Sequence, residues 1–154
     1  MLFLQEFIIF TVVLALFFDF INGFHDSANA ISTVVATKVL SPVRAVGMAA
    51  IGNLIGPLFF STAIAATIGK GIINIELVQD KEILVLMIFS ALVGAIVWDL
   101  ITWYSGLPTS SSHALVGGLT GAGLAAIGSN SINISGVEKV VAFMVLSPVI
   151  GMVA

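Results

Sequence analysis

Long apolar runs, separated by short polar stretches, dominate the sequence. A helix needs about 20 mostly apolar residues to cross the hydrocarbon core of a bilayer, and three runs come near or above that length. These runs cover residues 2–18, 45–68 and 83–104. The pattern therefore predicts an all-α membrane protein, folded as a polytopic helical bundle.

The same pattern predicts broken or re-entrant helices. One straight helix over 3–39 would be about 55 Å long, whereas the hydrocarbon core is only about 30 Å thick. We therefore expect this segment to break, kink or tilt strongly, with a break at Gly23. After the third run, Gly106 and Pro108 interrupt the chain. The helix predicted over 110–127 is barely long enough to span and is a candidate re-entrant half-helix.

Two further features concern packing and the end of the sequence. Gly47, Gly52 and Gly56 lie in the second run, where small residues favour close approach of another helix.

The last apolar run covers 139–154 and stops after 16 residues, short of a spanning length of about 20. We therefore expect the sequence to be truncated within a transmembrane segment.

Composition narrows the class of protein. Hydrophobic residues make up 59% of the chain and charged residues 8%, whereas soluble domains carry roughly 25% charged residues. The protein is therefore expected to lie within a lipid bilayer. Its expected localisation is the cell (cytoplasmic) membrane, which it would cross several times. A net charge of −3 without a basic run indicates no nucleic-acid partner.

The stretch DFINGFHDSANAIST, residues 19–33, is polar where polarity is costly. On a helical wheel its main polar side chains fall on one stripe less than a quadrant wide. The stripe consists of Asp19, Asn22, Asp26, Asn29 and Thr33. Their carboxylate and amide oxygens suit Na⁺ or a proton, and an acid at bilayer depth requires a partner or a water-filled cavity. Alternatively, Asp19 lies at a wet helix end and Asp26 in a loop, both merely solvated. His25 falls off the stripe, where packing or hydrogen bonding is the expected role.

The stretch GLPTSSSH, residues 106–113, predicts a helix start. Pro108 favours helical φ there, and Thr109 or Ser110 is the expected N-cap. The hydroxyl groups belong to Thr109, Ser110, Ser111 and Ser112. A helix N-terminus binds anions through unpaired N–H groups and its partial positive charge, and transporters hold anionic substrates on half-helices within the membrane. The alternative is an ordinary cap at the membrane surface.

No Arg or Lys lies within a predicted span, so an anion bound here must be balanced by dipoles, hydroxyls and a bound cation. A Na⁺ or H⁺ at Asp26 supplies that balance, which predicts coupling between the two ligands. Asp99 lies either in the same cavity or at its rim. An enzyme is not expected, because His113 follows the serines immediately and the sequence lacks a G-x-S-x-G elbow. A histidine metal site is not expected either, because the two histidines are 88 residues apart.

Together, the two motifs resemble those of the inorganic phosphate transporter (PiT) family. GFHDSANAISTVVATKVLSPVRAVGMAAIGNLIGP, residues 23–57, resembles its G-x-N-D-x-A-N-A signature. WDLITWYSGLPTSSSHALVGGLTGAG, residues 98–123, resembles its W…T…G-L-P-[TV]-S-[ST]-[ST]-H signature. His25 stands where the family usually has Asn.

The resemblance implies a cation-coupled phosphate symporter built from two inverted repeats and working by alternating access. Residues 1–154 would be the amino-terminal repeat, because no second D-x-A-N-A occurs. The expected partners are inorganic phosphate, Na⁺ or H⁺, the bilayer, the carboxy-terminal repeat and a second copy in a homodimer. No cofactor beyond the coupling ion is expected. A carrier of sulfate or another tetrahedral oxyanion, and an uncoupled anion channel, remain alternatives.

By motif position, the resemblance also implies a set of site residues. Asp26 and Asn29 would bind the coupling ion, which is the bound metal if the ion is Na⁺, and Asn22 of the stripe joins them. Phosphate would be bound by Asp26 and by the hydroxyl residues at the helix start. Those residues are Thr109, Ser110, Ser111 and Ser112.

Overall fold

The structure, a computed structural model, describes residues 2–153, with side chains described except at residues 2, 57 and 60–70. Over this range most of the chain is helical. The α-helices are α1 (Leu2–Ala36), α2 (Pro42–Ile72), α3 (Lys81–Tyr104), α4 (Ser111–Ile127) and α5 (Ile134–Val153), with short 3₁₀ turns η1 (Ile75–Leu77) and η2 (Ser129–Ser131). The predicted all-α fold is confirmed.

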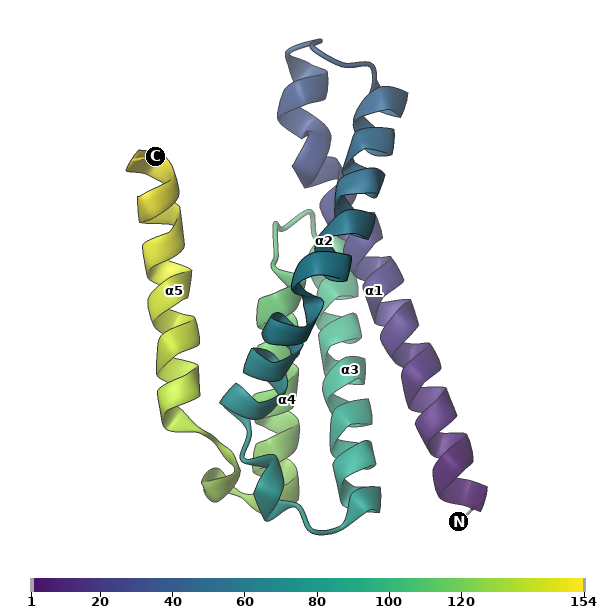
Figure 1. The fold of residues 1–154 in the computed structure, drawn as a ribbon, viewed down its shortest axis with the longest axis vertical. Helices are drawn as coiled ribbons and strands as arrows, with labels where there is room; N and C mark the ends of the chain where they lie inside the picture. The colour runs from purple at the N-terminus through teal and green to yellow at the C-terminus, as the bar shows by residue number, and fades with distance from the viewer. Residues whose placement is uncertain (1, 154) are drawn as a thin grey trace.

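Four helices form a bundle, and α5 stands apart from it (Figure 1). α3 and α4 make an antiparallel pair, and α1 runs beside α3 in the same direction as α3. The final turns of α1 and the first turns of α2 extend beyond the end of the α3–α4 pair and lie beside each other (Figure 1). The polar stretch 19–33 therefore runs from the bundle into this α1–α2 extension.

α1 is one continuous helix, so the predicted break at Gly23 is wrong. Its 35 residues give a length of about 52 Å. A single glycine costs a helix only about 1 kcal/mol relative to alanine, which long apolar flanks offset. The helix is instead inclined against α3, which is one of the ways in which a long helix fits a bilayer (Figure 1).

The predicted interruption after the third run is confirmed. α3 ends at Tyr104, and α4 begins at Ser111. Gly106 between them has φ 65°, in the left-handed region that favours glycine. The chain reverses there, so the start of α4 comes to lie beside the end of α3 (Figure 1).

Small residues let α3 and α4 approach closely. A Cβ atom added at Gly118 of α4 would overlap the backbone of Ala91 in α3, and one at Gly94 would lie 3.9 Å from the Cα of Gly118. The glycines predicted to serve this purpose do not: a Cβ atom at Gly47, Gly52 or Gly56 would meet no described atom within 4 Å. Of these, Gly52 and Gly56 line a groove between α1 and α2 instead.

The small apolar core lies at the opposite end of the bundle from the α3–α4 turn. Ile72, Ile73 and Met87 are buried there against one another. The Asn74 N–H donates to the Ser131 carbonyl at 2.8 Å, and the Asn133 N–H donates to the Ile72 carbonyl at 2.9 Å. These bonds tie the end of α2 to the segment before α5.

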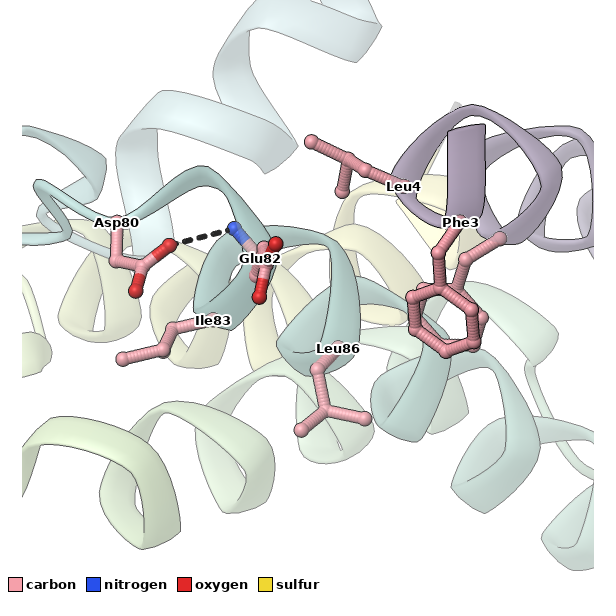
Figure 2. A pocket seen from close by; sticks show the side chains of 7 residues that line it. Phe3, Leu4, Asp80, Glu82, Ile83 and Leu86 are labelled. Carbon is pink, nitrogen blue, oxygen red and sulfur yellow. Dashed lines mark hydrogen bonds between the residues drawn. The ribbon is translucent and has the colours of Figure 1, made fainter. Parts of the chain in front are cut away.

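The start of α3 is capped and borders an apolar groove (Figure 2). The Asp80 carboxylate accepts a hydrogen bond from the Glu82 N–H at 2.8 Å, as an N-cap does. Phe3 and Leu4 of α1 line the groove across from Leu86, and its volume is about 390 Å³. The groove lies near the amino-terminal ends of α1 and α3, far along both helices from the two polar motifs.

Most large apolar side chains face outwards, as expected for helices surrounded by lipid. Within the described residues, three helical segments are long and apolar enough to span a membrane. They are Phe3–Ala36, Lys81–Tyr104 and Ile134–Val153. The predicted run at 45–68 lies within α2 but includes side chains outside the description. α5 begins before the last apolar run of the sequence and has 20 residues.

Candidate functional site at the start of α4

The first part of the polar stripe of α1 lies along one side of a groove shared with α2. The groove has a volume of about 630 Å³. Asp19, Asn22 and Asp26 line it from α1, and Asn53 lines it from α2. The unbroken helix keeps the predicted stripe on one face, because residues three and four apart stay aligned.

The stripe residues differ in exposure. Asn22 and Asp26 are partly buried, whereas Asp19, Asn29 and Thr33 are exposed. Asn29 and Thr33 are absent from the groove lining that the structure describes. The structure thus brings Asn22 and Asp26 together and leaves Asn29 one turn further along α1, in the extension beyond the bundle.

The start of α4 has the predicted cap. Ser110 is the N-cap, and its hydroxyl accepts a hydrogen bond from the His113 N–H at 3.5 Å. The Thr109 hydroxyl accepts one from the Trp98 indole N–H at 3.3 Å. The first intrahelical bond runs from the Ala114 N–H to the Ser110 carbonyl at 3.0 Å. The N–H groups of Ser111 and Ser112 precede this bond and point out of the helix start.

A hydrogen bond joins the two polar motifs. The buried Ser111 hydroxyl donates to the Asn22 side-chain oxygen at 2.6 Å. Ser112, the next residue, is exposed. A helix start suited to anions therefore contacts a stripe suited to cations, and Ser111 and Asn22 form the contact.

Asp99 of α3 is completely buried. Both of its carboxylate oxygens lack a hydrogen-bond partner in the part of the chain that the structure describes. The hydroxyl of its neighbour Thr102 donates to the main-chain oxygens of Trp98 and Asp99, both at 3.0 Å, and not to the carboxylate.

The burial of Asp99 excludes an exposed position at the rim, and Asp99 is not among the described residues that line the α1–α2 groove. It lies inside the helix interface and not at an exposed rim. The sequence contained a signal for this position, because Ala91, Ala95 and Asp99 recur at a spacing of four and share the face of α3 that packs inwards. His25 of α1 is partly buried.

The available cation ligands are oxygens. Among the described residues, no group of three or more His, Cys, Asp or Glu side chains is placed to hold a metal ion. The oxygens near Asn22 and Asp26 come from carboxylate, amide and hydroxyl groups, which suit hard cations such as Na⁺.

A helical membrane bundle whose polar groups meet at the start of a helix, after an interruption of the chain, is typical of a membrane transporter. Comparison with known proteins agrees with this class. Residues 22–154 match the family model described as "Phosphate transporter family". The chain belongs to this phosphate transporter family.

Relatives and a solved structure show the same likeness. The chain is 51% identical over 142 residues to a "Probable low-affinity inorganic phosphate transporter" of Rhizobium meliloti (strain 1021), covering 92% of this chain and 41% of that protein. It is 46% identical over 145 residues to a protein of the same name from Bacillus subtilis (strain 168), covering 94% and 42%. The solved structure "The sodium-dependent phosphate transporter" matches with a TM-score of 0.89 and 34% identity, over 95% of this chain and 36% of that one. The chain spans about two fifths of the length of these curated relatives.

Proposed function

We propose that the protein carries inorganic phosphate across the cell membrane by symport with a cation, through alternating access. The observation that carries this proposal is the Ser111–Asn22 hydrogen bond, which joins the helix start to the cation-type stripe. The names of the relatives, which refer to phosphate transport, support the substrate.

We propose that Asp26, with Asn22 and Asn29, binds the coupling ion. Na⁺ is the first choice and H⁺ the alternative, because the similar solved structure is that of a sodium-dependent phosphate transporter. Asp26 contributes a formal negative charge, and the two amides contribute neutral oxygens. Asn29 is exposed in this chain, so its part in the site is the least supported by the geometry.

Phosphate is proposed to bind at the start of α4, with Asp26 accepting a hydrogen bond from a protonated phosphate oxygen. The residues are Thr109, Ser110, Ser111 and Ser112. The backbone N–H groups of Ser111 and Ser112 are oriented for an anion there. A cation at Asp26 lowers the cost of bringing phosphate near the carboxylate, and phosphate strengthens cation binding by the same factor.

We also propose that residues 1–154 form the amino-terminal repeat of the transporter, and that a carboxy-terminal repeat and a second copy complete it. The proposal rests on the family resemblance and on the share of the relatives' length that this chain covers. In such folds the substrate lies near the bilayer midplane between the repeats. The exposed polar face at Asn29 and Thr33 suits an approach of that second repeat.

A counterflow experiment distinguishes a phosphate carrier from a carrier that accepts several oxyanions and from a channel. We expect proteoliposomes of the full-length protein, loaded with unlabelled phosphate, to accumulate external labelled phosphate transiently above equilibrium, because a carrier exchanges its substrate. Loading with sulfate should give no such overshoot. Protein-free liposomes are the control, with the membrane potential clamped throughout. If labelled phosphate only equilibrated, without an overshoot, the protein would be a channel. If loading with sulfate gave an equal overshoot, the protein would be a general oxyanion carrier.

A further inference from the structure

Trp98 of α3 carries an indole N–H that is hydrogen-bonded to the segment just before α4. The N–H donates to the Thr109 hydroxyl at 3.3 Å, across the interruption between the two helices. Trp98 is about half exposed, whereas Thr109 is partly buried. An indole N–H that is away from water needs an acceptor, and among the described residues Thr109 provides it.

The other hydrogen bonds between α3 and this connection end before Thr109. The N–H groups of residues 105–107 donate to main-chain oxygens near the end of α3, at 2.9–3.1 Å. Pro108 has no N–H to donate. Among the described hydrogen bonds, the indole of Trp98 is therefore the link that fixes Thr109 to α3.

The direction of this bond determines what the Thr109 hydroxyl can do. A threonine hydroxyl has one proton to donate and two lone pairs that accept, whereas an indole N–H only donates. The bond with Trp98 therefore occupies a lone pair of the Thr109 oxygen. The hydroxyl proton stays available for a ligand.

The neighbouring hydroxyls show two different arrangements. The Ser110 hydroxyl also accepts a hydrogen bond, from the His113 N–H at 3.5 Å, and keeps its proton. The Ser111 hydroxyl instead donates its proton to the Asn22 side-chain oxygen at 2.6 Å. Of these three hydroxyls, those of Thr109 and Ser110 are thus held ready to donate, and donors are what an anion requires.

The bond from Trp98 also makes the Thr109 hydroxyl a stronger donor. A group that accepts a hydrogen bond is polarised by it, and the effect grows where water is excluded. Residues 83–127 contain no Lys or Arg. A phosphate at the start of α4 therefore depends on neutral donors of this kind.

We propose that Trp98 is a positioning residue for phosphate: its indole N–H holds the Thr109 hydroxyl with the proton directed at the anion. The inference rests on the proposed function, which places phosphate at the start of α4. Trp98 acts through Thr109 and does not itself contact phosphate. Loss of the indole N–H should therefore weaken phosphate binding without slowing transport at saturating phosphate.

The test replaces Trp98 by phenylalanine in the full-length protein. Trp98→Phe removes the N–H and keeps an aromatic ring, and because Trp98 is 53% exposed the smaller ring leaves no buried cavity. Binding of labelled phosphate to purified protein is titrated at fixed Na⁺ and pH, and initial uptake is measured in proteoliposomes. We expect the phosphate Kd and KM to rise about threefold to tenfold, the size of effect that one neutral hydrogen bond gives. Maximal uptake should stay at the wild-type value.

Trp103→Phe is the matched control for this variant. Trp103 lies on the same helix, is 49% exposed and packs its ring against Phe24 with the centroids 5.4 Å apart. Its indole N–H donates no hydrogen bond among the described residues, and a phenyl ring retains the contact with Phe24. The control should bind phosphate as wild type does.

Thr109→Val distinguishes positioning from a merely structural effect of Trp98. Valine keeps the shape of threonine and lacks the hydroxyl, so this variant should also raise the phosphate Kd. If Trp98 acts through the Thr109 hydroxyl, adding Trp98→Phe to Thr109→Val should change the Kd by less than about twofold, whereas independent effects would multiply.

Two results would overturn the inference: a Trp98→Phe protein with the wild-type phosphate Kd, or effects of the two substitutions that multiply in full. With either result, Na⁺-driven phosphate uptake by the wild-type protein would leave the proposed function standing. A wild-type full-length protein that neither binds nor carries phosphate would overturn the proposed function and this inference together.

Discussion

Asp26→Asn is expected to reduce cation-driven phosphate uptake to the background of protein-free liposomes. Asp26 is partly buried, lines the α1–α2 groove and lies one turn from the Asn22–Ser111 contact. Asparagine keeps the size of the side chain but removes the negative charge that holds the cation. Without that cation, the phosphate charge at the helix start is not balanced. The measurement is initial uptake of labelled phosphate by proteoliposomes under an imposed Na⁺ gradient.

The matched control for this variant is Glu6→Gln. Glu6 is an exposed carboxylate on the same helix, far from the groove, and the substitution makes the same change of charge and shape. Uptake by this control should equal that of wild type. Normal gradient-driven uptake by Asp26→Asn would show that the cation is held elsewhere.

Ser111→Ala is expected to raise the phosphate KM about tenfold, with Ser110→Ala raising it by a smaller factor. Ser111 is buried, and its hydroxyl connects the helix start to Asn22 at 2.6 Å. In the proposed site the Ser111 hydroxyl turns from Asn22 to donate to phosphate, and loss of a hydrogen bond to a charged ligand costs about 1.5–3 kcal/mol, or roughly tenfold or more. Ser110 acts as N-cap, and its loss costs the helix about 1 kcal/mol. Concentration-dependent uptake in proteoliposomes gives both values.

Ser90→Ala provides the reference for the serine variants. The Ser90 hydroxyl is exposed and donates to the Leu86 carbonyl within α3 at 2.8 Å, so its removal leaves the site intact. Its KM should stay at the wild-type value. If Ser111→Ala and Ser110→Ala also leave the KM unchanged, phosphate does not bind at the start of α4.

Much of the fold followed from local signals in the sequence. The apolar runs predicted the helices, and Gly106 with Pro108 predicted the interruption before α4 because both residues act on their own backbone. The break predicted at Gly23 was wrong, because a single glycine weakens a helix without ending it. The packing of Gly118 on Ala91 depends on which faces of α3 and α4 meet, and spacing within one segment does not reveal this.

The candidate site was predictable as two separate motifs. Their contact, Ser111 to Asn22, depends on the tertiary arrangement of α1 and α4 and could only be inferred from the resemblance. The sequence alone does not determine whether Asp99 is buried, because an acid near a helix end is usually solvated. The contacts of α3 with α1 and α4 settle that point. The exposure of Asn29 and Thr33 was not foreseen either.

The dependence of phosphate uptake on a cation gradient tests the central claim most directly. Full-length protein in proteoliposomes is given labelled phosphate with an inward Na⁺ gradient, an inward H⁺ gradient, or neither, at a clamped membrane potential. The account predicts accumulation of phosphate above equilibrium with the Na⁺ gradient, or with the H⁺ gradient if protons are the coupling ion, and none when both gradients are abolished. If phosphate entered as fast without either gradient as with one, and accumulated to the same level, that result would contradict cation-coupled symport.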